Sequence, residues 1–403
     1  MSQQSVSPEA IPSGAILYLS LAAFGSGVAL RMTDAMLPRL AAEFSISLAS
    51  AANVITMFAL AYGVAQLFFG PLGDRYGKYR VISWACVACS VTAILCGLAP
   101  NYHALLGARL LAGASAAAVL PLAMAWIGDV IPYERRQSVL ARFLIGQILG
   151  VSAGVWVGGF TADHLHWSQP FLILGAGYFG ISFALMAMNR RLPERARLLR
   201  ASNGPALANM VGEFKQVLML PWARTVLATV FLEGACIFGG LAFVATHLHR
   251  VHGLALSNGG LTVMLFGFGG FLFAASSAML VRRLGEVGLI RWGGALFAGS
   301  TLTIALAPAW QWAIPGCFVA GLGFYMMHNT LQTNATQMAP ERRGVAVSAF
   351  ASCYMLGQAL GVAVGALMIE QLGSAVAIAF FGCATLLVGL NFARLRVRSL
   401  QAS

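Results

Sequence analysis

The sequence has few charged residues for its length. Only 9% of its 403 residues are Asp, Glu, Lys or Arg, whereas about 25% is usual in a soluble globular domain. Hydrophobic residues make up 59%, and the mean hydropathy is +0.78. A soluble domain of this size could not cover so much apolar surface, because folding buries only about 75% of what the unfolded chain exposes. The composition excludes an ordinary soluble enzyme and a disordered protein, and it predicts a polytopic membrane protein.

Signals of several other protein classes are also missing. Residues 1–13 contain no Lys or Arg, so they lack the positive region of a signal peptide, and we expect the first apolar run to remain as a spanning helix. No phosphate-binding loop of the form G-x-x-x-x-G-K-[ST] occurs, so nothing supports an ATP-driven pump. No cysteine lies in a polar loop, and we interpret even Cys86 and Cys89 as small buried apolar residues.

Apolar runs long enough to cross a bilayer, which takes about 20 residues, occur throughout the chain. They cover residues 14–37, 49–70, 80–98, 104–129, 137–162, 169–189, 222–248, 258–281, 289–307, 311–338, 344–370 and 374–393. We therefore expect an all-α membrane protein of twelve transmembrane helices in two six-helix, pseudo-symmetric halves. The expected divisions are an N-terminus at 1–13, halves at 14–189 and 222–393, a linker at 190–221 and a tail at 394–403.

The net charge of +12 reflects membrane topology rather than a nucleic-acid partner. Most of the 25 Lys and Arg residues lie in alternate loops, the linker and the tail, while the opposite loops hold only Arg39 and Arg250. This asymmetry follows the positive-inside rule. We expect both termini and the linker to be cytoplasmic, and we expect no binding to nucleic acid.

A glycine-rich charged segment follows the second apolar run and reads Gly70-Pro-Leu-Gly-Asp-Arg-Tyr-Gly-Lys-Tyr-Arg80. It resembles the signature of the major facilitator superfamily. The matching residues are Gly70, Leu72, Asp74, Arg75, Gly77 and Arg80, with Lys78 where a basic residue is usual. Glycines permit a tight turn and close helix approach, and an acid here can pair with a cation or a helix N-terminus. We interpret the segment as a loop that latches one conformation.

The second half contains a weaker echo of this motif at Met279-Leu-Val-Arg-Arg-Leu-Gly285. Arg282 stands where Asp74 stands in the first half. The echo supports a repeat ancestry for the two halves, but it does not support a second acidic latch.

Two segments resemble the drug:proton antiporter branch of that superfamily. The first helix has Asp34 four residues before Pro38, and the fourth has an R-x-x-x-G pattern at Arg109, with Ala112 in place of the usual Gln. At a rise of 1.5 Å per residue, Arg31, Asp34 and Arg109 lie at similar depths. A charge in the membrane needs a partner or water. We therefore expect both arginines to surround Asp34, either as a proton-coupling site or as a static cluster.

The fifth apolar run carries glycines in steps of four, at Gly146, Gly150, Gly154 and Gly158, followed by Gly159. The spacing predicts close packing against another helix rather than ligand contact. The region resembles the antiporter signature G-P-x-x-G-G, but Val155 replaces the proline. This departure keeps uptake open as an alternative to export.

Two further features are candidates for proton or substrate binding. Glu233 is an isolated acid near the middle of the seventh run, and it carries a proton or serves as a paired structural residue. The tenth run has a polar stripe of Tyr325, His328, Asn329 and Gln332 at helical spacing. In lipid such a stripe must face protein or water, so it lines a substrate path or bonds between helices. Weaker path candidates are Asn53, Arg142, Gln147 and Gln358.

Most of the seven histidines lie in or beside the expected outer loops, at His103, His164, His166, His247, His249 and His252. Those at 247–252, with Asp163, His164 and His166 facing them, could bind a divalent metal or respond to the outside pH. Their spacing matches no closed structural metal site. We expect ordinary polar loop and interface residues and no bound metal.

Over nearly its whole length, the chain resembles a major facilitator permease, most closely the bacterial drug:proton antiporters and efflux permeases. The resemblance implies secondary transport by alternating access, with no enzymatic reaction and no cofactor beyond the proton gradient. We expect a monomer in the bacterial inner membrane that exports a small organic solute or drug in exchange for protons. Proton-coupled or facilitated uptake of a metabolite is the main alternative. A divalent-metal exporter and a membrane receptor without transport are weaker ones.

Overall fold

A computed structural model describes residues 12–197 and 206–401, and every regular element in these ranges is a helix. The first range contains α1 (Ser13–Arg31), α2 (Leu37–Glu43), α3 (Leu48–Tyr76), α4 (Lys78–Gly97), α5 (Tyr102–Ala116), α6 (Val119–Val130), α7 (Tyr133–His164), α8 (Gln169–Arg191) and α9 (Glu194–Arg197). The second contains α10 (Ala206–Met219), α11 (Pro221–Leu241), α12 (Val244–His252), α13 (Leu256–Leu306), α14 (Ala313–Gln337), α15 (Arg343–Leu372) and α16 (Ser374–Gln401), with 3-10 turns at Trp310–Trp312 and Pro340–Arg342.

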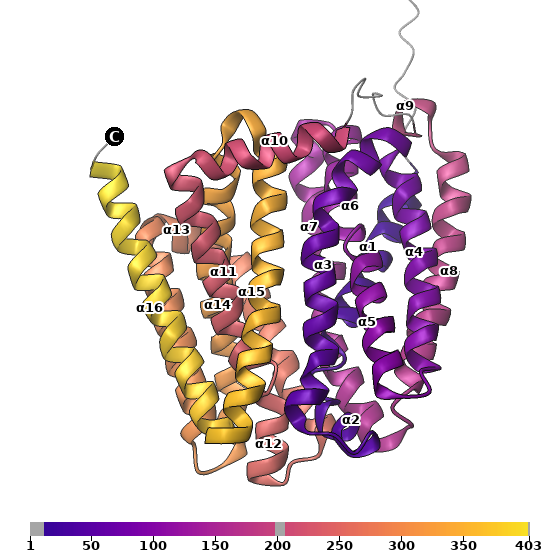
Figure 1. The fold of residues 1–403 in the computed structure, drawn as a ribbon. Coiled ribbons are helices and arrows are strands. Elements are labelled where there is room, and N and C mark those ends of the chain that lie inside the picture. Colours follow the sequence, from indigo (N-terminus) through magenta and orange to yellow (C-terminus); the bar gives the residue numbers. More distant parts are fainter. Residues whose placement is uncertain (1–11, 198–205, 402–403) are drawn as a thin grey trace, which may run out of the picture.

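The helices form two bundles that stand side by side (Figure 1). In the first bundle α1 packs on α7 and α4 on α8, and in the second α11 packs on α15 and α13 on α14 and α16. The most extensive contacts between the bundles are those of α3 with α15 and of α7 with α13. We call the end that carries α9 and α10 the α10 end, and the opposite end, with α2 and α12, the α12 end.

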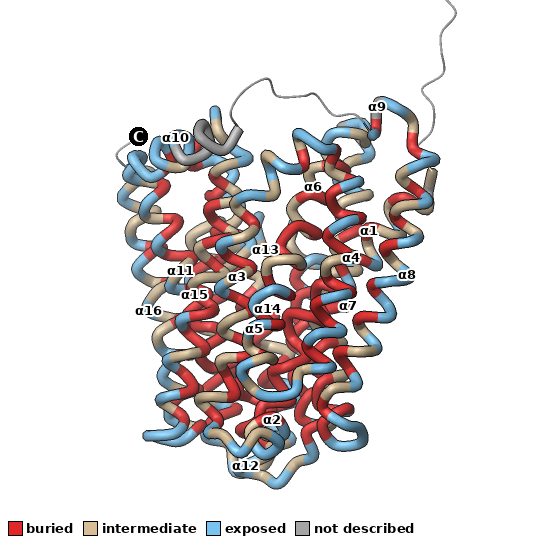
Figure 2. Tube along the Cα trace, turned by 45° about the vertical axis from the view of Figure 1, so that its right-hand side comes forward, coloured by how far each residue is buried: buried red, intermediate tan, exposed pale blue. Residues whose placement is uncertain are grey.

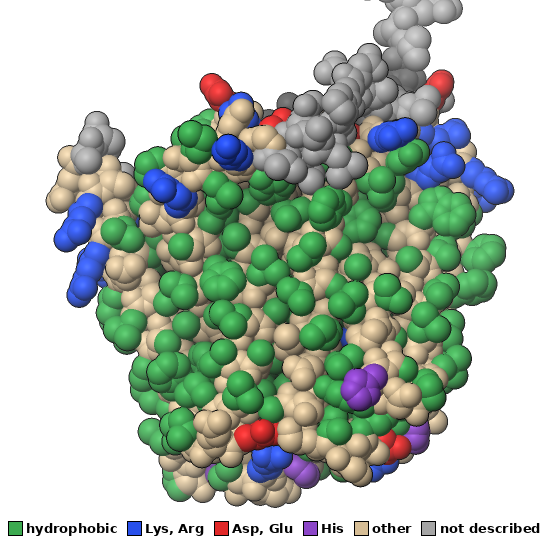
Figure 3. All heavy atoms as spheres, in the orientation of Figure 1, with side chains coloured by type: hydrophobic (Ala, Val, Ile, Leu, Met, Phe, Trp, Pro, Cys, Tyr) green, Lys and Arg blue, Asp and Glu red, His purple; other side chains and the backbone are tan. Residues whose placement is uncertain are grey.

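The surface has the division expected of a protein that crosses a bilayer. Hydrophobic side chains cover the middle of the molecule, while Lys and Arg gather at the α10 end (Figure 3). Buried residues run through the middle of both bundles (Figure 2). Ten helical segments of the described chain are long and apolar enough to cross a membrane. The chain is therefore a multi-pass membrane protein.

The number of spans stays a prediction. One of the ten segments, α13, contains Gly285 with φ 62° and ψ −180°, so two helices meet there at a kink. This break lies between the runs expected at 258–281 and 289–307. The ten segments do not include α14, which carries the polar stripe.

The first expected helix, 14–37, is interrupted in the structure. α1 ends at Arg31, and residues 32–36 form turns before α2 begins. Pro38 has no N–H, so a continuous helix would leave the Asp34 carbonyl without its hydrogen bond. Asp34 therefore lies in a turn and not on a helix.

Two other expected helices are divided as well. The run at 104–129 forms α5 and α6, because Pro121 has no N–H for the carbonyl of Ala117. The run at 222–248 forms α11 and α12, and the break follows Gly239 and Gly240, which have low helix propensity.

The polar segments expected at 1–13, 190–221 and 394–403 fall partly outside the described residues. Within the described part, the linker contains α9 and α10, and the tail continues α16. α10 lies along one end of the molecule, where it contacts α3, α11 and α15 (Figure 1). The exact limits of the two halves stay predictions.

The glycines of α7 pack against the backbone of α1, as their spacing predicts. A Cβ atom would collide with or press on the facing residue at four successive contacts: Gly146 on Ser20, Gly150 on Phe24, Gly154 on Val28 and Gly158 on Met32. Gly159 faces Leu256 of α13 instead. The same arrangement recurs in the second bundle, where Gly357, Gly361 and Gly365 of α15 face Phe231, Ala235 and Gly239 of α11. The two bundles thus repeat one packing pattern.

Candidate functional site

A buried ion pair lies at the turn after α1. Arg31 Nη2 is 2.8 Å from Asp34 Oδ2, and the two side chains are 3% and 2% exposed. The Arg31 guanidinium also lies over the ring of Phe238 in α11, 4.6 Å from its centre. Within the described chain, Arg31 Nη1 and Asp34 Oδ1 have no hydrogen-bond partner. This ion pair therefore joins the first bundle to the second, and one polar atom of each side chain can still form a hydrogen bond.

Arg109 lies beside the same turn, where its Nη2 is 3.5 Å from the Thr33 hydroxyl, but its shorter hydrogen bonds go to backbone carbonyls. Its Nε donates to the carbonyl of Val54 at 3.1 Å, and its Nη1 donates to the carbonyl of Ala29 at 3.0 Å. Its guanidinium lies 4.2 Å from the ring centre of Phe58. Of the two arginines expected around Asp34, Arg31 forms the ion pair, while Arg109 ties α5 to the backbones of α1 and α3.

A second acid–base pair joins α11 and α14. Glu233 is fully buried, and its Oε2 lies 2.9 Å from Nδ1 of His328, which is 18% exposed. For this contact to be a hydrogen bond, either the imidazole donates to a carboxylate or a carboxylic acid donates to the imidazole. The other carboxyl oxygen of Glu233 has no hydrogen-bond partner among the described residues. The pair can therefore hold a proton and still accept a further donor.

Aromatic rings connect the two pairs. His328 stacks on Phe324 at 5.0 Å between ring centres and contacts Tyr354 at 4.6 Å. Tyr354 contacts Phe238 at 5.7 Å, and Phe238 lies under the Arg31 guanidinium. A continuous series of contacts therefore runs from the Arg31–Asp34 pair of one bundle to the Glu233–His328 pair of the other.

The signature segment at 70–80 is helical, not the loop that the sequence predicted. α3 continues through Pro71 to Tyr76, and α4 begins after Gly77 alone, whose φ of 88° supplies the turn. Gly70 does not permit a close approach, since a Cβ there would meet nothing within 4 Å. The close approach occurs at Gly73, which packs against Leu122 of α6.

Lys78 forms the centre of this segment. Its Nζ lies 2.6 Å from Asp74 Oδ1 and 2.9 Å from Asp129 Oδ2 at the end of α6. Arg75 is exposed and lies over Tyr76, and Arg80 is exposed. The bridge fixes the ends of α3, α4 and α6 together. The sequence did not identify Asp129, which lies 51 positions beyond Lys78 and outside the motif.

A family model described as Major Facilitator Superfamily matches residues 19–362. The chain belongs to the Major Facilitator Superfamily. An uncharacterized MFS-type transporter of Bacillus subtilis (strain 168), YceJ, is 24% identical over 340 residues, which are 83% of this chain and 84% of the relative. The multidrug export protein EmrB of Haemophilus influenzae is 29% identical over 157 residues, which are 39% of this chain and 31% of EmrB.

The fold agrees with this membership. The crystal structure of a mutant of the nucleoside transporter NupG has a TM-score of 0.78 at 12% identity, and the match covers 94% of this chain and 98% of NupG. The superfamily and these relatives are transporters. The chain is therefore a membrane transporter and not an enzyme.

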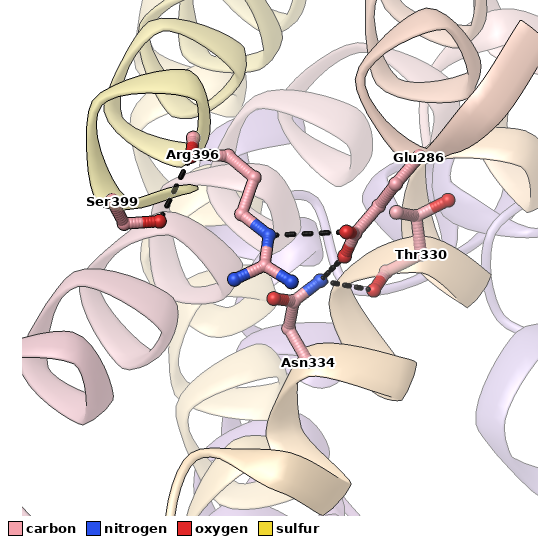
Figure 4. Close-up of polar contacts among 5 residues, drawn as sticks. All are labelled: Glu286, Thr330, Asn334, Arg396 and Ser399. Atoms are coloured by element: carbon pink, nitrogen blue, oxygen red, sulfur yellow. Dashed lines mark hydrogen bonds and ion pairs between the residues drawn. The ribbon is translucent and has the colours of Figure 1, made fainter. Parts of the chain in front are cut away.

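In this superfamily member, the second bundle has a charge bridge at the position that corresponds to Lys78. The charges are reversed, because an acid and not a base stands at its centre. Gly285 stands in place of Gly77, and Glu286 follows it where Lys78 follows Gly77. Glu286 accepts a hydrogen bond from Arg396 Nε of α16 at 3.0 Å and another from the side-chain amide of Asn334 in α14 (Figure 4). Arg282, in the position of Asp74, is exposed.

The remaining path candidates of the transporter lie in different surroundings. On α14, Tyr325 and Gln332 are half-buried and Asn329 is exposed. Gln358 of α15 is fully buried, and its amide has no hydrogen-bond partner within the described ranges. Three others occupy separate places: Gln147 is half-buried in α7, Arg142 is exposed on the same helix, and Asn53 donates to the Tyr102 hydroxyl at 3.3 Å.

The histidines at the α12 end bond to different partners rather than to one another. His247 is buried and its Nδ1 lies 2.8 Å from Ser374 Oγ, while Nδ1 of His249 bonds to the Leu254 carbonyl at 2.9 Å. His166 lies 2.8 Å from Ser168 Oγ. Across the residues that the structure describes, no group of three or more His, Cys, Asp or Glu side chains could hold a metal.

Proposed function

We propose that this transporter exports a small organic solute in exchange for protons, and that the Glu233–His328 pair carries the proton. The buried carboxyl group of Glu233, with one oxygen bonded to His328 and the other without a partner among the described residues, is the observation that carries the proposal. An ionisable group inside a membrane bundle is costly, and such groups commonly mark ion or substrate paths. The similarity to the multidrug export protein EmrB supports export.

Competition for one carboxyl group couples the two fluxes. A proton on Glu233 neutralises its charge, whereas a donor group of a bound solute forms its strongest hydrogen bond with the unprotonated carboxylate. The Glu233–His328 pair then holds either a proton or the solute as the two bundles rock about the substrate site that lies between them. Asp34 is the second candidate for this role, although Arg31 already neutralises it. The exposed polar side of α14, with Asn329 and half-buried Gln332, forms part of the solute path.

The proposed topology follows the distribution of basic residues. Lys and Arg gather at the α10 end (Figure 3), so this end faces the cytoplasm under the positive-inside rule. We propose that both termini face the cytoplasm, that the chain works as a monomer in a bacterial inner membrane, and that the proton gradient drives transport without a cofactor.

Proton flux in proteoliposomes tests this proposal. A pH-sensitive dye is sealed inside, and drugs, sugars, nucleosides and amino acids are added in turn to wild type, Glu233→Gln, Asp34→Asn and the control Glu43→Gln. We expect a compound-dependent proton flux that Glu233→Gln abolishes and Glu43→Gln retains, because Glu43 is a partly exposed acid at the α12 end. Flux that survives in the double variant Glu233→Gln/Asp34→Asn would show that neither acid carries the proton.

Uptake is the second candidate function, and the departure of α7 from the antiporter signature at Val155 favours it. The same assay separates the two directions. Antiport moves protons opposite to the added compound, whereas symport moves both the same way. A solute flux without proton movement would instead indicate a facilitator.

A further inference from the structure

Two carboxylates at the α12 end bind the first turns of helices in the opposite bundle. Asp163, in the last turn of α7, accepts hydrogen bonds from the N–H groups of Ser257 at 2.7 Å and Leu256 at 3.3 Å, at the start of α13. Glu370, near the end of α15, accepts one from the N–H of Ala49 at 2.7 Å, at the start of α3. Each bundle thus provides one carboxylate and receives one.

These contacts follow the internal repeat of the fold. α7 and α15 are the two helices whose glycines pack on α1 and α11, so they occupy equivalent places. The helix pairs α7 with α13 and α3 with α15 make the most extensive contacts between the bundles. The two carboxylates therefore hold both of these helix pairs together at the α12 end of the molecule.

The chemistry of a helix N-terminus makes these contacts strong. The first-turn N–H groups have no partner within their own helix, and they carry a partial positive charge. A carboxylate that accepts from them forms a charge-assisted hydrogen bond. The residue before α13, Ala255, provides no side-chain cap, so Asp163 fills that role from the other bundle.

We propose that Asp163 and Glu370 form a paired gate that holds the α12 end closed and must release both helix N-termini when that end opens. The named charge bridges at the α10 end stay within one bundle, since Lys78 joins α3, α4 and α6 and Glu286 joins α13, α14 and α16. The gate carboxylates instead link charge in one bundle to the backbone of the other. The gate is independent of the proposed proton site and of the solute.

Distance measurements between spin labels test the gate. Labels are placed on Leu98→Cys and Leu306→Cys, at the ends of α4 and α13, which are 64% and 69% exposed at the α12 end and lie one in each bundle. Cys353 and Cys383, the two cysteines that are not buried, are replaced with Ala. Double electron–electron resonance then reports the distance distribution in lipid nanodiscs without added solute.

We expect one main distance in the parent protein and a second, longer distance in Asp163→Ala and Glu370→Ala. Each loss should raise the ratio of open to closed α12 ends by about fivefold, and the two effects should multiply in the double variant because the sites are separate. Glu43→Ala is the matched control, because Glu43 pairs with Arg39 and His166 inside one bundle. Its distribution should match that of the parent.

An unchanged distribution in the double alanine variant would overturn the gate, as would an equal change in Glu43→Ala. If the alanine variants fail to fold, Asp163→Asn and Glu370→Gln provide the test, because the amide oxygen still accepts the hydrogen bond but has no charge. Intermediate opening in these variants would support the gate. Parent-like distances in well-folded amide variants would show that charge has no part in it.

Discussion

Among single residues, Arg109 illustrates a buried charge that holds helices together. It is 1% exposed and its guanidinium satisfies two backbone carbonyls of other helices. We predict that Arg109→Lys lowers the stability by about 2 kcal/mol, because an ammonium group cannot donate from both places and hydrogen bonds to charged groups contribute about 1.5–3 kcal/mol. Thermal unfolding in detergent measures the change. Arg142→Lys, at an exposed site of α7, should unfold at the parental temperature. An unchanged melting temperature in Arg109→Lys would refute this structural role.

The residue scale also shows what the sequence could and could not predict. Glu233 and His328 were each recognisable as polar residues in apolar runs, but their contact joins positions 95 residues apart. Arg31 and Asp34 are three residues apart, so their pairing was predictable from local spacing. Arg109 was expected near Asp34 because the two share a depth, and it does reach the neighbouring Thr33, but depth did not indicate that its main acceptors are backbone carbonyls of α1 and α3. Asp129 was missed because its partner Lys78 lies in another helix.

At the scale of helices, the glycine contacts between α7 and α1 can be tested by adding one methyl group. A Cβ at Gly150 would collide with the carbonyl of Phe24, which is backbone and cannot move aside as a side chain can. We predict that Gly150→Ala costs about 1–3 kcal/mol, the usual range for overpacking, and lowers the melting temperature. Gly361→Ala in α15 should behave the same way, because it faces the carbonyl of Ala235. Gly180→Ala in α8, with nothing within 4 Å, should be neutral or slightly stabilising.

The helix boundaries show which signals the sequence carried at this scale. Apolar length located most of the spanning runs, because a bilayer sets a minimum helix length. The breaks near Pro38 and Pro121 could have been predicted, since proline cannot supply the helical N–H. The helical signature segment was not, because Gly70 and Pro71 suggested a loop although α3 accommodates both. The glycines of α15 have the spacing of those in α7, so the same rule would have found them.

At the scale of the whole molecule, the gate and the two bundles predict opposite movements at the two ends. If each bundle moves as a unit about the central site, opening of the α12 end must bring the bundles together at the α10 end. Labels on Arg191→Cys and Arg394→Cys, exposed residues of α8 and α16, report the α10 end. We predict that the double variant Asp163→Ala/Glu370→Ala shortens this distance in the same fraction of molecules that lengthens the distance between labels at residues 98 and 306. The Glu43→Ala control should move neither pair.

A longer distance at the α12 end with no change at the α10 end would mean that the gate helices separate locally while the bundles keep their relative orientation. That result would remove rigid rocking as the movement that the gate controls, because bundles that rock as rigid bodies about a point between the two ends must change the distance at both ends.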